Sequence, residues 1–331
     1  SPLNMDHRDR PVLGIDLGGT KILAAVVDPN GTILSRSKRK TKSEKGPADV
    51  LERMAACVRD AVQAAGLQMS DIASAGVGAP GPLDPIRGII IDTPNLKFVD
   101  VHLKDELESR ISVPVFVDND VNVGTYGEFV YGAARGVQDV VGLFVGTGLG
   151  GGVIINGKLH HGFSLNGGEL GHMILDPDGP VCGCGNHGCL EAFSSRTAIQ
   201  REIESAIQAG KPSIIPELVK GDMSQITSSV LKKAFESNDP VVEKTLKTAC
   251  EYLGIAVGSL LNILSPEVVV LGGGVVEALP DLFVKQVRKK AFKIAFPICC
   301  KDVRIVASEL GDDAVILGAA ALGRQRLAEA N

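Results

Sequence analysis

The sequence lacks the features that place a protein in a membrane or on a nucleic acid. No stretch of its 331 residues approaches the ~20 consecutive apolar residues of a membrane-spanning helix. The formal net charge is −5, so there is no large positive field to attract nucleic acid or an anionic membrane surface. Residues 1–10 are polar and have no apolar core of a secretion signal, and we interpret them as a leader or tag remnant. We therefore expect a cytoplasmic protein without membrane or nucleic-acid partners.

A disulfide framework is also absent, because the sequence has seven cysteines, an odd number, and no secretion signal. Cys57 and Cys250 fall in helical patterns, where we expect small core residues. Cys299 and Cys300 are neighbours and form no known motif. The other three lie within eight residues of one another: Cys182, Cys184 and Cys189.

Two stretches of the sequence follow one design: an apolar strand, a glycine turn, a second strand and an Asn-Gly hairpin turn. The first copy consists of residues 12–15, 18–19, 22–27 and 30–31, and the second of residues 140–145, 146–152, 153–155 and 156–157. Strands alternate with amphipathic helices elsewhere, which indicates an α/β protein. The length favours two domains, and the slight identity between the copies makes the repeat structural rather than literal.

The first glycine turn has the parts of a phosphate-binding hairpin. Gly18 and Gly19 allow the backbone to approach a polyphosphate and to direct amide hydrogens at it. Thr20 adds a hydroxyl, Lys21 a positive charge, and Asp16 a carboxylate for a magnesium ion or its waters. An ordinary tight hairpin turn is the alternative, and a second such loop later in the chain makes it less favoured.

The second glycine turn matches a dinucleotide-binding fingerprint through Gly146, Gly148 and Gly151. That motif requires a helix at its end, so that the helix N-terminus can hold the pyrophosphate. Here the glycines lead into residues 153–157, which have the pattern of a strand and a turn, so we reject this interpretation. Thr147 and Gly148 instead become candidates for contact with ATP.

A third glycine run, Gly272, Gly273 and Gly274, ends a fully apolar strand. It could accept a flat adenine and its ribose at close range. A simple strand-to-helix turn explains the same residues equally well.

Polar residues follow the strand at 115–117, and strand ends are where α/β proteins place ligands. A carboxylate here could take the proton from a hydroxyl group that attacks a γ-phosphate. We expect only one of Asp118 and Asp120 to face a site. A helix N-cap or a turn is the alternative role for either residue.

Two further carboxylates, Glu169 and Glu191, lie near a glycine-rich segment and could accept hydrogen bonds from a hydroxyl-rich ligand. Ordinary surface glutamates are the alternative, which spacing alone does not exclude.

The three clustered cysteines predict a zinc site, because tight cysteine-rich loops in a reducing compartment are typical of zinc. A tetrahedral site needs a fourth ligand, and both His172 and His187 are candidates. Three thiolates and one histidine would close the coordination sphere, so such a zinc ion would be structural.

These motifs together resemble the ROK family (repressors, open reading frames and sugar kinases). The resemblance covers residues 12–327 and rests on four segments: Asp16–Lys21, Asn119–Asn122, Leu143–His172 and Cys182–Glu191.

The resemblance implies an actin-like (ribonuclease H-like) α/β ATPase fold with two domains and an active site in the cleft. Residues 11–120 and 313–330 would form a small domain, and residues 121–312 a large one with a zinc loop at 172–189. It implies that Asp120 is the catalytic base and that His172, rather than His187, completes the zinc site. The residues implied to contact the sugar are Asn95, Asn119, Asp120, Glu169, His172 and Glu191.

The implied activity is ATP-dependent phosphorylation of a hexose at its 6-hydroxyl, with Mg²⁺ accompanying ATP. Residues 94–96 resemble a segment of the members that phosphorylate glucose, so glucose is the expected substrate. The sequence departs from the family pattern at residues 97–98 and 165–167, which leaves N-acetylglucosamine, N-acetylmannosamine, mannose or fructose as alternatives.

Other classes of protein fit the sequence less well than a sugar kinase does. A non-catalytic sugar sensor would not need both phosphate loops and Asp120, and a chaperone-like ATPase would not account for the cysteine loop. The family's repressors carry a DNA-binding domain, and a first strand near Val12 leaves no room for one. The resemblance also suggests a homodimer or homotetramer.

Overall fold

The computed structural model describes residues 6–331 and divides into two compact units. Unit 1 comprises the chain up to Gly136 together with Leu159–Gly168 and Asp312–Asn331, and unit 2 comprises Val137–Lys158 and Glu169–Gly311. Of the expected leader, residues 1–5 lie outside the described residues, and His7–Asp9 form a short 3-10 helix, η2. No helix within residues 6–331 is both long and apolar enough to cross a membrane.

Unit 1 is built on a five-stranded sheet with the strand order β3-β2-β1-β4-β8. The strands are β1 (Val12–Leu17), β2 (Lys21–Val27), β3 (Ile33–Lys40), β4 (Ala75–Ala79) and β8 (Val115–Asn119). The first three are antiparallel, whereas β1, β4 and β8 run parallel. The strands predicted at residues 12–15 and 22–27 are confirmed, and their apolar runs are buried because helices cover both faces of the sheet.

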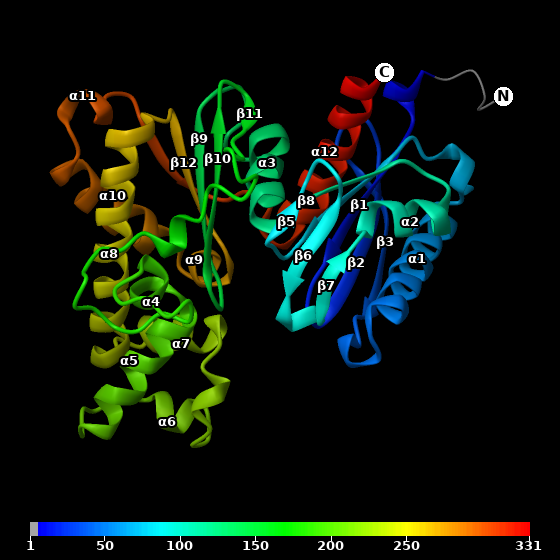
Figure 1. Ribbon diagram of the computed structural model, residues 1–331. Coiled ribbons are helices and arrows are strands. Elements are labelled where there is room, and N and C mark those ends of the chain that lie inside the picture. The colour runs from blue at the N-terminus through cyan, green and yellow to red at the C-terminus, as the bar shows by residue number, and fades with distance from the viewer. Residues whose placement is uncertain (1–5) are drawn as a thin grey trace. The chain divides into compact units, whose positions relative to one another are not determined.

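Figure 1 shows the helices of unit 1 in two layers, with α1 and α2 on one face of the sheet and α12 and α3 on the other. Their bounds are α1 Pro47–Ala64, α2 Leu103–Ile111, α3 Asp120–Tyr131 and α12 Ala314–Ala330. Helix α12 lies directly on the sheet, since a Cβ at Gly14 or Gly76 would lie 2.0 or 1.7 Å from its backbone carbonyl oxygens. Glycine at these two positions is what permits the close approach.

A second, three-stranded sheet in unit 1 carries one predicted site residue. It consists of β5 (Leu83–Asp84), β6 (Ile89–Thr93) and β7 (Phe98–Val101) in that order. The 3-10 helix η5 (Pro94–Leu96) connects β6 to β7, and exposed Asn95 lies at its centre.

Unit 2 repeats the arrangement with the strand order β11-β10-β9-β12-β13. Its strands are β9 (Val140–Val145), β10 (Leu149–Ile155), β11 (Lys158–Leu159), β12 (Val268–Gly272) and β13 (Arg304–Ala307). The helices are η6 (Leu170–His172), α4 (Leu190–Ser194), α5 (Arg196–Gln208), α6 (Ile215–Leu218), α7 (Ser228–Glu236), α8 (Pro240–Leu264), α9 (Gly274–Ala278), α10 (Pro280–Ile294) and α11 (Pro297–Cys300). In both sheets an antiparallel hairpin precedes parallel strands, so the predicted structural repeat is confirmed.

The two units differ from the predicted domain division at two segments. Residues 121–136 and 159–168 belong to unit 1 rather than to the second domain. Helix α3 accounts for the first of these, because its backbone lies against α12: a Cβ at Gly318 would be 1.8 Å from the carbonyl oxygen of Val123. Residues 159–168 are tied to the rest of unit 1 by hydrogen bonds of the His161 and Asn166 side chains.

Candidate active site

The turn between β1 and β2 is an open hairpin. The Gly18 amide donates to the carbonyl oxygen of Lys21 (3.0 Å), and the Thr41 hydroxyl donates to the carbonyl oxygen of Gly18 (2.7 Å). Gly19, Thr20 and Lys21 are exposed at its tip. The tip of this turn is therefore accessible.

Asp16 lies at the base of this hairpin, in β1. Burial raises the pKa of Asp16 from 3.8 to about 6, and the positive charge of Lys21 partly opposes the shift. A carboxylate that is costly to ionise when alone is suited to a cation, whose charge would favour the ionised form. Asn95 lies near the same turn, because a Cβ at Gly19 would be 3.7 Å from the Cβ of Asn95.

The segment after β8 separates the two candidate carboxylates. The strand does not continue past Asn119, and α3 begins at Asp120. The Asn119 side chain caps the helix by accepting hydrogen bonds from the amides of Val121 (2.9 Å) and Asn122 (3.3 Å). Asp120 is thus the first helical residue, at the end of α3 where the helix dipole stabilises negative charge.

Asp118 occupies a different environment from Asp120. Its side chain is 1% exposed, and its Oδ2 accepts hydrogen bonds from Arg326 (2.6 Å) and His161 (2.7 Å). Burial alone would raise the pKa of Asp118, but the His161 hydrogen bond and the Arg326 charge outweigh it and lower the pKa. A buried, ionised and fully bonded carboxylate is poorly suited to accept a proton from a ligand.

The turn between β9 and β10 is the counterpart of the first hairpin in unit 2. The Gly146 amide donates to the Gly148 carbonyl oxygen (2.9 Å), and a strand follows, which confirms that this loop is not the dinucleotide motif. The predicted turn at residues 146–152 was too long, because β10 already begins at Leu149. The last three glycines of the predicted turn, residues 150–152, lie in β10. A Cβ at Gly151 would be 2.4 Å from the Leu170 side chain.

Side chains hold the second turn from several directions. The Thr147 hydroxyl accepts a hydrogen bond from Arg196 (2.8 Å), and the Thr147 carbonyl oxygen accepts one from the Thr197 hydroxyl (2.8 Å). Glu191 Oε1 accepts a hydrogen bond from the Leu149 amide (2.9 Å). This hairpin is therefore braced, in contrast to the open hairpin of unit 1.

Four predicted ligands form a compact cluster beside this turn. The ligand atoms of His172, Cys182, Cys184 and Cys189 all lie within 4.8 Å of one another. The sulfurs of Cys184 and Cys189 are 3.6 Å apart, and Cys182 Sγ is 3.7 Å from His172 Nδ1. A tetrahedral zinc ion with Zn–S bonds of about 2.3 Å requires sulfur–sulfur distances of about 3.8 Å, so the donor set fits zinc.

The alternative ligand His187 is not part of the cluster. Its Nδ1 donates to the carbonyl oxygen of Gly179 (3.0 Å) instead. Glu191 connects the cluster to the second hairpin, because its Oε2 lies 3.6 Å from Cys182 Sγ while its Oε1 binds the Leu149 amide. Glu169, exposed, immediately precedes η6, which carries His172.

The third glycine run forms a strand-to-helix turn. Gly272 ends β12, and Gly273 has φ of +87° and precedes α9. A Cβ at Gly273 would be 2.3 Å from the Val145 carbonyl oxygen, so glycine is needed for packing against β9. Contact with a nucleotide stays a prediction here.

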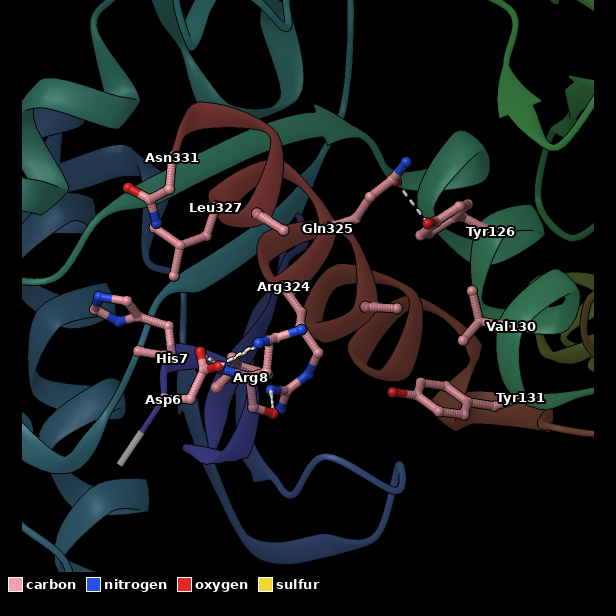
Figure 2. A pocket seen from close by; sticks show the side chains of 14 residues that line it. Asp6, His7, Arg8, Tyr126, Val130, Tyr131, Arg324, Gln325, Leu327 and Asn331 are labelled. Carbon is pink, nitrogen blue, oxygen red and sulfur yellow. Dashed lines mark hydrogen bonds and ion pairs between the residues drawn. The ribbon is translucent and has the colours of Figure 1, made fainter. Parts of the chain in front are cut away.

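A large cavity of unit 1 lies away from all of these residues. It has a volume of about 550 Å³ and lies beside α3 and α12, with both ends of the described chain at its rim (Figure 2). Tyr126, Tyr131 and Arg324 are among its lining residues, and Figure 2 shows Tyr126 hydrogen-bonded to Gln325. No predicted site residue lines it.

Known proteins resemble this chain along almost its whole length. A family model described as ROK family matches residues 12–326. A glucokinase of Thermotoga maritima is 36% identical over 96% of this chain and 98% of its own length. A xylose repressor of Caldicellulosiruptor bescii is 30% identical over 94% of this chain and 77% of its own length. The crystal structure of a ROK family glucokinase from Streptomyces griseus, in complex with glucose and AMPPNP, has a TM-score of 0.81 at 32% identity, covering 95% and 99% of the two chains.

Proposed function

The chain belongs to the ROK family and has its two-domain actin-like ATPase fold, and we propose that it transfers the γ-phosphoryl group of ATP to the 6-hydroxyl of glucose. The observation that carries the proposal is the contrast between two neighbouring carboxylates. Asp118 is buried and bonded on both oxygens, whereas Asp120 opens α3 behind an asparagine cap. Relatives named glucokinase support the phosphorylation of a sugar.

Asp120 would act as the general base. Its carboxylate accepts the proton of the 6-hydroxyl while the hydroxyl oxygen attacks the γ-phosphorus. Phosphoryl transfer depends mainly on positioning and electrostatics. The Asn119 cap supports this role because it fixes the first turn of α3, on which Asp120 is carried.

The remaining polar residues would orient the sugar. We assign hydroxyl contacts to Asn95, Asn119, Asp120, Glu169, His172 and Glu191. Carboxylate and amide oxygens accept hydrogen bonds from sugar hydroxyls, which is the chemistry that all of these residues except His172 share. Glucose is preferred over sugars with a 2-N-acetyl group because the glucokinase relatives are similar over nearly the whole chain.

The glycine hairpins would hold the nucleotide. Gly18, Gly19, Thr20 and Lys21 form an accessible turn whose amides and charge suit phosphate oxygens. We assign the remaining contacts with ATP to Thr147, Gly148 and the glycine run Gly272–Gly274. Asp16 would hold Mg²⁺ directly or through water, and that ion would neutralise charge on the β- and γ-phosphates.

The cluster of His172, Cys182, Cys184 and Cys189 would hold one zinc ion with a structural role. Its four donors leave no open coordination position for chemistry. Glu191 links the cluster to the second hairpin, so the metal would stabilise both the hairpin and the segment that carries Glu169.

The proposal is tested by coupled ADP release with magnesium-ATP and a panel of glucose, mannose, fructose, N-acetylglucosamine and N-acetylmannosamine. The highest kcat/KM is expected on glucose. A higher value on an N-acetyl sugar would keep the mechanism and replace the substrate. Absence of turnover on every sugar, with zinc-replete protein, would contradict the kinase.

A sugar sensor without turnover is the second candidate, because xylose repressors match over 94% of this chain. In that case calorimetry would detect hexose binding to a protein that releases no ADP.

A further inference from the structure

The two oxygens of Asp118 bind two different parts of unit 1. Oδ1 faces the segment that leads to the proposed base, where it accepts hydrogen bonds from the Asn119 amide (2.7 Å) and from Asn122 Nδ2 (3.1 Å). Oδ2 accepts hydrogen bonds from Arg326 of α12 (2.6 Å) and from His161 (2.7 Å). One buried carboxylate thus joins three segments that are far apart in the sequence.

The segment that carries His161, residues 159–168, is hereafter called the strap. The chain leaves unit 2 after Lys158, contacts unit 1 along the strap and re-enters unit 2 at Glu169. Two side chains anchor it: His161 on Asp118, and Asn166, whose Oδ1 accepts a hydrogen bond from the Leu83 amide (3.0 Å). The proposed sugar ligand Glu169 and the metal-cluster residue His172 follow immediately.

The hydrogen bond between Asp118 and His161, hereafter the anchor, is well suited to hold the strap in one position. Asp118 is 1% exposed, and Arg326 balances its charge and also donates to the Val117 carbonyl oxygen (2.9 Å). His161 is 20% exposed, so one face of its ring is in contact with solvent while its Nε2 is bonded. Because Arg326 already neutralises the carboxylate, the buried charge does not require His161, and the histidine adds a connection to the strap.

We propose that Asp118 and His161 are positioning residues for the sugar: the carboxylate fixes the start of α3, and through His161 it fixes the strap and hence the start of the segment that carries Glu169. This inference rests on the proposed function for the identity of the sugar ligands. The anchor itself can be measured without turnover.

The division of the two oxygens predicts which kinetic constant changes. Removal of the His161 ring leaves both Oδ1 hydrogen bonds and the Asn119 cap in place, so Asp120 keeps its position and transfer from a bound sugar is nearly normal. The strap would spend less time in its anchored position, and apparent affinity falls in proportion to the population of the competent state. A hydrogen bond to a charged group limits the loss to between about tenfold and a hundredfold.

The first experiment compares His161→Ala with His160→Ala, which removes the exposed neighbouring histidine. His161→Ala is expected to raise the KM for glucose at least about tenfold, with kcat and the KM for ATP within about threefold of the original protein. His160→Ala should change none of them. His161→Gln, which retains an N–H donor at similar reach, should restore most of the loss. Equal KM values for His161→Ala and His160→Ala would overturn the inference.

A second experiment does not depend on catalysis. The chain contains no tryptophan, and Phe163 in the strap is fully exposed, so Phe163→Trp places a single fluorescent reporter there. In that background His161→Ala should lower the fluorescence anisotropy of the reporter, and His160→Ala should not. Unchanged anisotropy with His161→Ala would overturn the anchor, whereas a mobile strap in a protein without kinase activity would count against the proposed function alone.

Discussion

The two hairpins that open the two sheets have the same connectivity but different surroundings. The turn of unit 1 exposes its backbone above a half-buried carboxylate, Asp16. The turn of unit 2 is braced by Arg196, Thr197 and Glu191, and Glu191 also contacts the cysteine cluster. A shared topology has therefore been adapted in one copy for accessibility and in the other for rigidity. Substitutions in each unit test this difference.

The brace of unit 2 should depend on the metal cluster. Cys189 is fully buried, and Cys189→Ser is expected to lose the zinc ion and to lower the free energy of unfolding by more than about 4 kcal/mol, because loss of a structural metal removes its binding free energy. The corresponding fall in Tm is roughly 8–16 °C. Metal analysis and thermal unfolding would measure both changes.

Cys250→Ser is the matched control, since Cys250 is equally buried but lies in α8, outside the cluster. It should cost stability without loss of zinc. An original protein that contains no zinc and is equally stable after chelation would contradict the metal assignment.

The chemistry assigned to unit 1 should depend on one carboxylate. Asp120→Asn is expected to lower kcat at least about 10²-fold with hexose binding retained, since the amide cannot accept the proton. Steady-state kinetics and calorimetry would separate the two effects. Asp100→Asn, at an exposed position of β7, is the control. Near-normal turnover by Asp120→Asn would show that another group is the base.

Local patterns in the sequence predicted most of the repeat and the clustering of the three cysteines. The strands of both hairpins follow from apolar runs between glycine turns, and the cysteine cluster follows from spacing within one loop. The partners of Asp118 could not be predicted in this way, because His161 and Arg326 lie 43 and 208 residues away along the chain. A buried carboxylate needs cationic partners, and that need is the relevant signal. A single sequence does not show where such partners lie.

The position of Asp120 shows a second limit. Residues two apart in a continuing strand point to the same face, so Asp118 and Asp120 differ in environment only because Asn119 ends the strand and caps a helix. An asparagine before a helical pattern is a cap signal in itself. The close packing of α3 on α12, which a single sequence does not show, accompanies this cap in the structure.

The open hairpin should carry a stability cost at neutral pH. Because burial raises the pKa of Asp16 to about 6, the folded state binds a proton more tightly than the unfolded state, and stability falls as pH rises from about 4 to about 6. Asp16→Asn should therefore raise the free energy of unfolding at pH 8 by about 1–3 kcal/mol and abolish magnesium-dependent activity. Denaturant unfolding at pH 8 and pH 4 would test this, since the gain should vanish at pH 4. An Asp16→Asn protein less stable at pH 8 would contradict the burial cost.

A methyl group added to each hairpin makes the smallest and most direct comparison. In Gly148→Ala the new Cβ would lie 2.6 Å from Glu191 Oε1 and displace the carboxylate from the Leu149 amide. Loss of that hydrogen bond corresponds to about 1 kcal/mol, or roughly a fivefold rise in the KM for glucose, in addition to the effect on the ATP contact assigned to Gly148. In Gly19→Ala the nearest atom is 3.7 Å away, an ordinary contact, so stability should change by less than about 0.5 kcal/mol. In Gly19→Ala only the KM for ATP should rise, because the added methyl group hinders the approach of phosphate to the turn. An unchanged KM for glucose in Gly148→Ala would contradict the link from the second hairpin to the sugar through Glu191.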